Sequence, residues 1–189
     1  MELSLIEKKI LLTAARESIR SIFSNEKMPA TDYSKFPIFK SKSGAFVTIT
    51  IKKKLRGCIG YITSTDPLFE TVCNSAIQAA TKDPRFQILK ESEFENIELE
   101  ISILSEPFPM NDYEEIEIGK HGLILEEEGR RALLLPQVPI EHNFNKDQFL
   151  SAICQKGGFP SNYWEKKLLN ISLFTASVFS EKELENLNE

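Results

Sequence analysis

The segment Leu55-Arg56-Gly57-Cys58-Ile59-Gly60 combines a thiol, a guanidinium and two glycines within six residues. In an extended chain alternate side chains point to the same face, so Arg56, Cys58 and Gly60 would share one face. A guanidinium beside a cysteine favours the thiolate, which is the reactive form. Gly60 would leave space over the sulfur, and glycines inside a strand often mark the close approach of a ligand or a backbone. The pattern predicts a nucleophilic or ligand-binding site at Cys58.

The same six residues also have a purely structural interpretation. A cysteine in a strand is often a small buried hydrophobic residue whose thiol is inert. Gly57 and Gly60 could do no more than admit a packed helix. The sequence of the segment leaves both interpretations open.

Three residues elsewhere in the chain are candidates to assist Cys58. His121 lies in the turn Gly119-Lys120-His121-Gly122, where an imidazole can be exposed and act as an acid or a base. Arg85 could hold an anionic group, although the alternative for Asp83-Pro84-Arg85-Phe86 is a turn that ends a helix. Glu100 could be a base or an ion-pair partner of Arg56, or simply part of a solvated strand face. We predict catalytic roles for Cys58 and His121, and ligand-binding roles for Arg56, Gly57, Gly60, Arg85 and Glu100.

Charge and composition disfavour several classes of function. The chain has 189 residues and a formal net charge of -5, unlike a general binder of nucleic acids or anionic membranes. Nucleic-acid binding through Arg56, Arg85 and the Lys52-Lys53-Lys54 run is the weakest option. Three widely separated cysteines and two histidines match neither a disulfide framework nor a zinc site. We therefore predict no metal site, and the sequence identifies no cofactor.

The N-terminal residues and the hydropathy favour a cytoplasmic location. Charged residues at Glu7-Lys8-Lys9 interrupt the apolar positions before a signal-peptide core could form. No apolar run approaches the roughly 20 residues that span a bilayer. We therefore expect a cytoplasmic protein without a membrane partner.

The Cys58 segment is expected to lie in a β-hairpin. Val47, Ile49 and Ile51 alternate with threonines, which predicts a strand. A second extended run covers residues 55–62, and the lysines between the two runs predict an antiparallel hairpin with a basic turn.

Helices are expected on both sides of this hairpin. The first 23 residues place apolar side chains on one stripe, formed by Leu5, Leu12, Ala15, Ile19 and Ile22. Asp66-Pro67 can begin a second helix that runs to Ala80.

The C-terminal half contains further strands and one helix. Strict alternation predicts a strand at 97–105. Apolar runs at 116–118, 123–125 and 132–135 predict a three-stranded meander. Asn145 can cap a helix carrying Phe149, and a last strand is expected at 171–179. Because helices and strands mix without regular βαβ alternation, the fold class is α+β.

Several motifs together resemble one protein family. The hexapeptide around Cys58 looks like the signature of the AMMECR domain family, whose bacterial and archaeal members are called AmmeMemoRadiSam system protein A. Other similar motifs follow in the expected order, namely residues 83–86, 101–105, 119–123, 133–138 and 156–158, and Trp164. The resemblance extends over about residues 44–180. Ala132 and Pro139 depart from the family pattern, where a glycine and a small residue are usual.

The resemblance implies a single α+β domain with two unequal lobes. The larger lobe, a mixed or antiparallel sheet with flanking helices, would cover roughly residues 1–105 and 145–189. The smaller antiparallel β lobe would cover roughly 106–144, and the hexapeptide would lie in a cleft.

The family has no settled biochemical activity, and its name implies an association with Memo-like and radical-SAM proteins. Two hypotheses follow. One is an enzyme that uses the Cys58 thiolate on a small molecule or a modified peptide end. The other is a non-catalytic accessory module that docks on a Memo-like partner.

Overall fold

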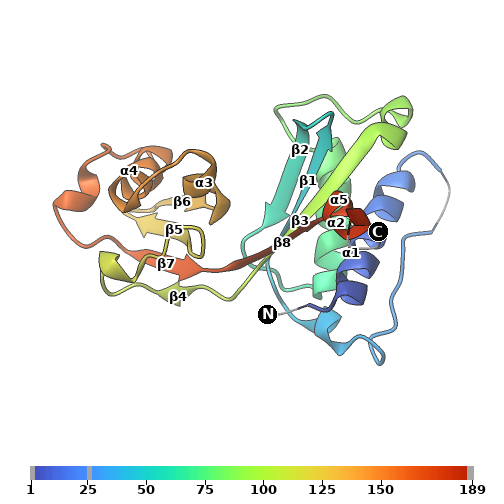
Figure 1. Cartoon of the computed structure of the whole chain (residues 1–189), viewed down its shortest axis with the longest axis horizontal. Coiled ribbons are helices and arrows are strands. Elements are labelled where there is room, and N and C mark those ends of the chain that lie inside the picture. Colours follow the sequence, from blue (N-terminus) through green and yellow to red (C-terminus); the bar gives the residue numbers. More distant parts are fainter. Residues whose placement is uncertain (1–2, 25–26, 187–189) are drawn as a thin grey trace. The chain divides into compact units, whose positions relative to one another are not determined.

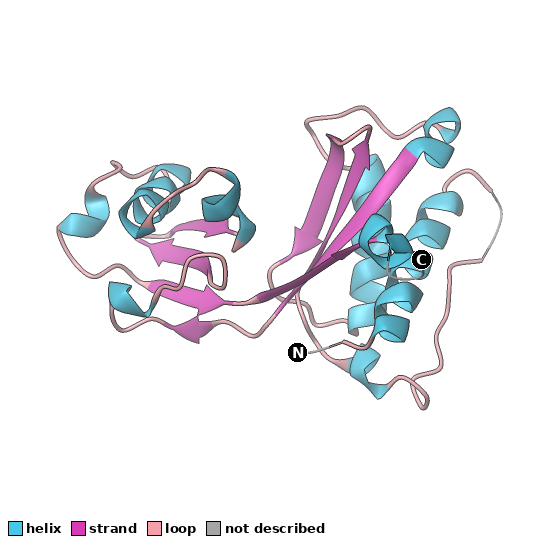
Figure 2. Ribbon diagram, in the orientation of Figure 1, coloured by secondary structure: helices cyan, strands magenta, loops and turns pink. Residues whose placement is uncertain are grey.

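The computed structural model describes residues 3–24 and 27–186. It confirms the α+β class, with two antiparallel four-stranded sheets and flanking helices (Figures 1 and 2). The α-helices are α1 (Leu5–Arg20), α2 (Leu68–Thr81), α3 (Gln137–Glu141), α4 (Lys146–Lys156) and α5 (Glu181–Asn186). The strands are β1 (Ala45–Ile51), β2 (Lys54–Tyr61), β3 (Ile97–Leu104), β4 (Phe108–Pro109), β5 (Gly122–Glu127), β6 (Arg130–Leu134), β7 (Ile171–Phe174) and β8 (Ala176–Ser180). Short 3-10 helices are η1 (Pro37–Lys40), η2 (Glu91–Asn96), η3 (Tyr113–Glu115) and η4 (Tyr163–Glu165).

The chain divides into two compact units. The first comprises Met1–Leu104 and Ser177–Glu189, and the second comprises Ser105–Ala176. Each unit has its own sheet and its own hydrophobic core.

The sheet of the first unit has the strand order β2-β1-β3-β8. The predicted hairpin is confirmed, because β1 and β2 pair antiparallel and Lys52-Lys53 form the turn. Val47 and Ile49 of β1 are fully buried, and α1 and α2 pack on that face of the sheet (Figure 1). Side chains at the alternate positions, such as Thr48, therefore lie on the opposite face.

The two long helices begin close to where the sequence places them. Ser4 and Glu7 form a capping box at the start of α1, whereas Met1 and Glu2 lie outside the described residues. Leu5, expected on the buried stripe, is 43% exposed, whereas Leu12, Ala15 and Ile19 are buried. For α2 the N-cap is Pro67 rather than Asp66, and the Leu68 amide donates to the Ser41 carbonyl instead of to a capping side chain.

The sheet of the second unit has the order β4-β7-β5-β6. The β5–β6 hairpin matches the prediction. The prediction of a strand at 116–118 is wrong, because these residues form a loop and the start of a turn after η3. The side chain of Ile116 is nevertheless buried in the core of the second unit. Instead of that run, β7 lies beside β5.

The last predicted strand is divided between the two sheets. Thr175 separates β7 from β8, and β8 pairs in the sheet of the first unit. The second unit thus continues to Ala176, whereas the family resemblance implied a smaller lobe that ends near residue 144. The reason is that α4, which Asn145 caps as predicted, and β7 pack in the same core as β5.

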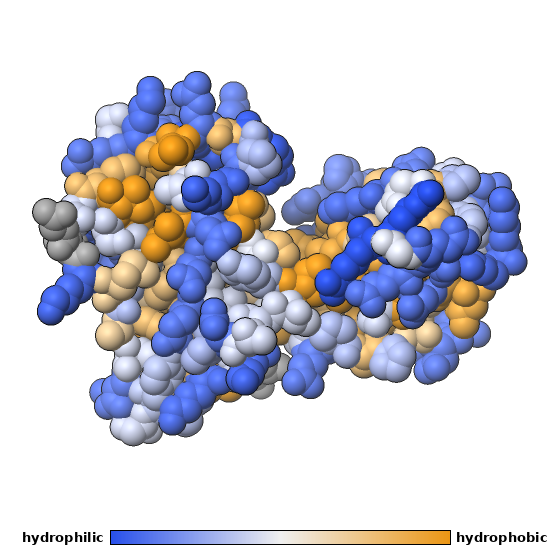
Figure 3. Space-filling view, turned by 180° about the vertical axis from the view of Figure 1, so that it is seen from behind, coloured by the Kyte–Doolittle hydropathy of each residue, from blue (hydrophilic) through white to orange (hydrophobic). Residues whose placement is uncertain are grey.

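The surface shown in Figure 3 is mostly hydrophilic, with smaller apolar areas on each unit. Within residues 3–24 and 27–186, no helix has the length and apolar character that a membrane crossing requires.

Candidate functional site

Cys58 lies on β2, an edge strand, and faces a polar neighbour on β1. The register places Thr48 opposite Cys58, and the Thr48 hydroxyl donates to the Cys58 sulfur over 3.3 Å. On its other side Thr48 lies opposite Glu100 of β3. These three residues, here called the Cys58 row, therefore cross three strands on the face away from α1 and α2. Cys58 is partly exposed, whereas Cys73 and Cys154 are buried.

The main chain of Cys58 is held by the turn that follows α2. Its amide donates to Asp83 Oδ2 over 2.8 Å, and Arg85 Nη2 lies 3.5 Å from its carbonyl oxygen. Arg85 also binds both carboxylate oxygens of Asp83, at 3.0 and 2.8 Å. Asp83 and Arg85 thereby supply the acceptor and the donor that a neighbouring strand would offer to this edge residue.

The charge of Asp83 is stabilised by these contacts. Its side chain is only 2% exposed. Hydrogen bonds from Arg85 and from the Cys58 amide nevertheless hold the pKa of this carboxyl well below its usual range, against the opposing effect of burial. The hydrogen bonds to Asp83 in turn raise the pKa of Arg85. The guanidinium that approaches the main chain of Cys58 is therefore that of Arg85.

Arg56 does not lie against the sulfur as expected. The pairing jumps from Ile49–Gly57 to Thr50–Leu55, so Arg56 is the extra residue of a β-bulge and the simple alternation fails. Its guanidinium binds both oxygens of Glu93, at 2.8 and 2.9 Å. It also donates to the Gln87 carbonyl over 2.8 Å. Among the described residues, its hydrogen bonds fasten the segment before β3 to β2.

This ion pair strongly affects the Glu93 carboxyl. The hydrogen bond from Arg56 is the main cause that lowers the pKa of Glu93 to about 2. The side chains of Arg56 and Glu93 are 16% and 27% exposed, so the pair is largely shielded from solvent. The contacts of Arg56 are those of a structural clamp.

The two glycines are also explained by packing. A Cβ at Gly57 would lie 2.2 Å from the carbonyl oxygen of Ala79 in α2. A Cβ at Gly60 would lie 2.2 Å from the Ala45 carbonyl oxygen and 2.6 Å from the ring of Phe46. Gly57 thus admits the helix, as the structural interpretation predicts. The space expected over the sulfur at Gly60 is instead filled by β1.

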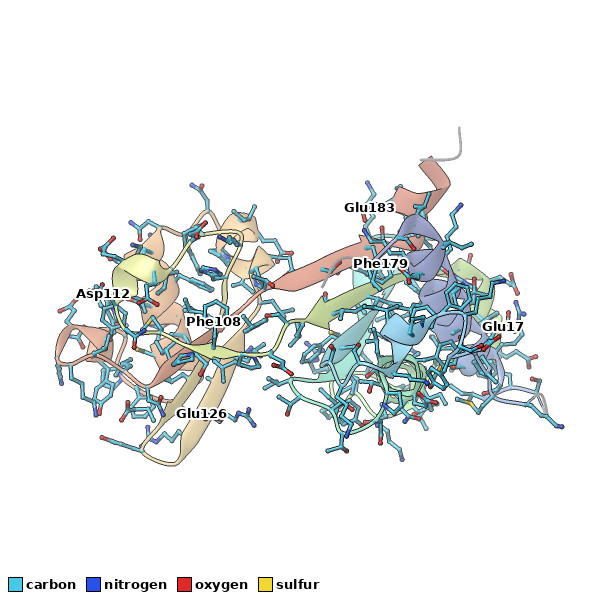
Figure 4. The ribbon with its side chains drawn as sticks, turned by 90° about the horizontal axis from the view of Figure 1, so that it is seen from below. Glu17, Phe108, Asp112, Glu126, Phe179 and Glu183 are labelled. Carbon is cyan, nitrogen blue, oxygen red and sulfur yellow. The ribbon has the colours of Figure 1, made fainter. Side chains whose placement is uncertain are left out.

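His121 is buried rather than exposed in its turn. It is 6% exposed, and its Nδ1 lies 3.2 Å from the Glu117 amide and 3.1 Å from the Glu115 carbonyl oxygen. Phe108 of β4, labelled in Figure 4, packs edge-on against the ring at 5.7 Å between centroids. The imidazole closes its own loop, which explains the burial. His121 belongs to the second unit and Cys58 to the first, so their joint role stays a prediction.

Metal binding has no geometric support in the part of the chain that the structure describes. There, no group of three or more histidine, cysteine, aspartate or glutamate side chains is arranged to hold an ion.

The AMMECR1 family model matches residues 12–179, a range that contains the Cys58 row, the Asp83–Arg85 turn and His121. The chain belongs to the AMMECR1 family. It is 41% identical to protein Ta0236 of Thermoplasma acidophilum, with 93% of this chain and 87% of that protein covered. It is 39% identical to protein Mbar_A1807 of Methanosarcina barkeri, with 94% and 92% covered.

A solved structure agrees with this assignment. The crystal structure of the uncharacterized protein PH0010 from Pyrococcus horikoshii superimposes with a TM-score of 0.82 at 33% identity. The match covers 92% of this chain and 90% of that one. AMMECR1 membership establishes the family and the fold, and the names of these relatives state no activity.

Thr48 and Glu93 are the site residues that sequence reasoning missed. The alternation of β1 placed Thr48 on the polar face, but only the register places it opposite Cys58. Glu93 and Arg56 are far apart in sequence, and no local pattern joins them. Asp83 accepts the Arg85 amide within the turn that follows α2, and it also accepts the Cys58 amide.

Proposed function

We propose that this AMMECR1-family protein acts on a small molecule or a modified peptide end through the thiolate of Cys58. One observation carries the proposal: ion pairing and packing account for Arg56, Gly57 and Gly60 of the hexapeptide, but they do not account for a thiol at position 58. Arg56 clamps Glu93, and Gly57 and Gly60 admit neighbouring backbone. Cys58 is partly exposed, and its sulfur receives a hydroxyl hydrogen bond from Thr48, which suits an anionic sulfur.

The surroundings of the sulfur restrict the chemistry that it could perform. In many acyl-transfer sites the amide of the nucleophilic residue helps to bind the developing oxyanion. Here the Cys58 amide already donates to Asp83. The proposal therefore favours attack on a carbon or sulfur electrophile that forms no oxyanion at this amide. Glu100, in the same row but two strands away from Cys58, is the acid–base candidate.

Alkylation by iodoacetamide tests the proposal. A stabilised thiolate gives a Cys58 labelling rate that changes by less than about twofold between pH 7 and pH 9, whereas the rate of a free cysteine peptide rises more than about tenfold. Peptide mapping assigns the label, and Cys58→Ser is the blank. Thr48→Val should restore a steep pH dependence, and Thr48→Ser, which keeps the hydroxyl, should not. A wild-type profile as steep as that of the free peptide would refute the thiolate.

A second candidate is an accessory module that docks on a Memo-like partner, in a pathway that also contains a radical-SAM protein. The clamp made by Arg56 and the packing at Gly57 favour it, because they give the hexapeptide a purely structural use. A folded Cys58→Ser variant separates the two candidates. Unchanged pathway output would support the module, and a folded but inactive variant would support chemistry.

A further inference from the structure

We infer that the Cys58 site selects a substrate bearing an anionic group, and that Arg85 is the specificity-determining residue. The inference rests on the proposed function, because it names the substrate class of that same site. Arg56 is the other arginine of the motif region, but its guanidinium is committed to Glu93 and is only 16% exposed. The side chain of Arg85 is 55% exposed.

The hydrogen bonds fix Arg85 at the main chain of the residue that carries the nucleophile. Asp83 holds its Nε and Nη2 atoms, and the same carboxylate accepts the Cys58 amide. Nη2 also lies 3.5 Å from the Cys58 carbonyl oxygen. A guanidinium held at two of its nitrogen atoms loses little conformational freedom when it binds a carboxylate or a phosphate.

The accessible charge at this position is positive, although Arg85 belongs to an ion pair. Asp83 is buried and its oxygen atoms face the Cys58 amide and the arginine, so an approaching ligand meets the guanidinium. Glu100, in the Cys58 row, and the net charge of -5 both oppose anion binding. A preference for anions would therefore report the local field of Arg85 and not the overall charge of the protein.

Three small disulfides of equal chain length test this charge preference: dithiodipropionate (anionic), bis(2-hydroxyethyl) disulfide (neutral) and cystamine (cationic). In each reaction the Cys58 thiolate attacks one sulfur, the disulfide bond breaks and the leaving thiolate departs with the electron pair. Mass spectrometry follows the mixed disulfide, and each rate is divided by that of a neutral model thiol with the same reagent. At low salt we expect the anionic reagent to react about threefold faster than the neutral one, with the cationic reagent slowest.

Variants assign the preference to Arg85. Arg85→Gln should abolish it, and Arg85→Lys should keep it. Arg131→Gln is the matched control, because Arg131 is 52% exposed, also pairs with a carboxylate and lies in the second unit. It should leave the order unchanged. If Arg85→Gln does not fold, the wild-type protein is assayed in about 1 M salt instead. Charges more than about 3 Å apart are largely screened there, so the preference for the anionic reagent should be lost.

The outcomes separate this inference from the proposed function. Equal normalised rates, faster reaction of cystamine, or an anion preference that survives Arg85→Gln would overturn the role of Arg85 while leaving a reactive thiolate intact. A steep iodoacetamide profile in the wild-type protein would instead remove the proposed function itself.

Discussion

Replacement of Glu93 by glutamine probes the clamp that holds the Arg56 bulge. The substitution keeps the shape of the side chain but removes the charge that binds Arg56 through two contacts of 2.8 and 2.9 Å. Arg56, with smaller contributions from the amide and the charge of Lys90, lowers the pKa of Glu93 from 4.5 to about 2, and the whole shift corresponds to ~3 kcal/mol of stability. Because the pair is still partly exposed, we expect Glu93→Gln to lower the free energy of unfolding by about 2 kcal/mol at pH 7.

The pH dependence of this loss follows from the direction of the shift. The folded protein holds the Glu93 carboxyl at a lower pKa than the unfolded chain, so the unfolded chain binds more protons in acid. The stabilisation is complete above about pH 5 and is lost as the pH falls from there toward about 2. The stability difference between wild type and Glu93→Gln should therefore shrink across this range.

Urea unfolding followed by circular dichroism at several pH values measures the difference. Glu91→Gln is a suitable control, because Glu91 is an exposed glutamate in the same 3-10 helix. Its replacement should change the stability by less than about 0.5 kcal/mol. A loss below that size for Glu93→Gln, or a loss that does not vary with pH, would refute the clamp. Arg56 would then be free to serve the sulfur, as its place in the hexapeptide suggested.

Three other substitutions test the local structure around and beyond the site. Gly57→Ala would place a methyl group 2.2 Å from the Ala79 carbonyl oxygen and should cost about 3 kcal/mol in urea unfolding. The control Gly129→Ala, with a φ of +74° and nothing within 4 Å, should cost about 1 kcal/mol, and equal losses would contradict the helix contact. Lys53→Gly should raise the thermal midpoint by relieving about 1 kcal/mol of backbone strain, because Lys53 has a φ of 62° in a two-residue hairpin turn. An unchanged or lower midpoint would argue against that strain. Asn145→Ala should cost about 1 kcal/mol, since the Asn145 side chain accepts the Gln148 amide at 2.9 Å, and no loss would show that the cap is dispensable.

The prediction of Arg56 as the partner of Cys58 illustrates where a local pattern fails. Side chains alternate between the two faces only along an unbroken strand. The β-bulge at Arg56 interrupts this alternation, so Arg56 and Cys58 need not share a face. The bulge and its clamp depend on Glu93, which the chain reaches only after α2 and a turn. No pattern within the hexapeptide contains that information.

Elements whose signals are local could be located from the amino-acid sequence. Alternation located the β1–β2 hairpin and β3, and Asn145 marked the start of α4, because a strand period and a cap depend on neighbouring residues. The family motifs, read as a set, also identified the AMMECR1 relationship.

The arrangement of these elements around the site depends on contacts between distant parts of the chain. Strand register brought Thr48 and Glu100 into a row with Cys58, and the turn after α2 brought Arg85 to its main chain. The apolar run at 171–179 reads as one strand, yet pairing divides it between two sheets. Register and sheet membership are set by contacts between residues far apart in the chain, so they depend on how the whole core packs.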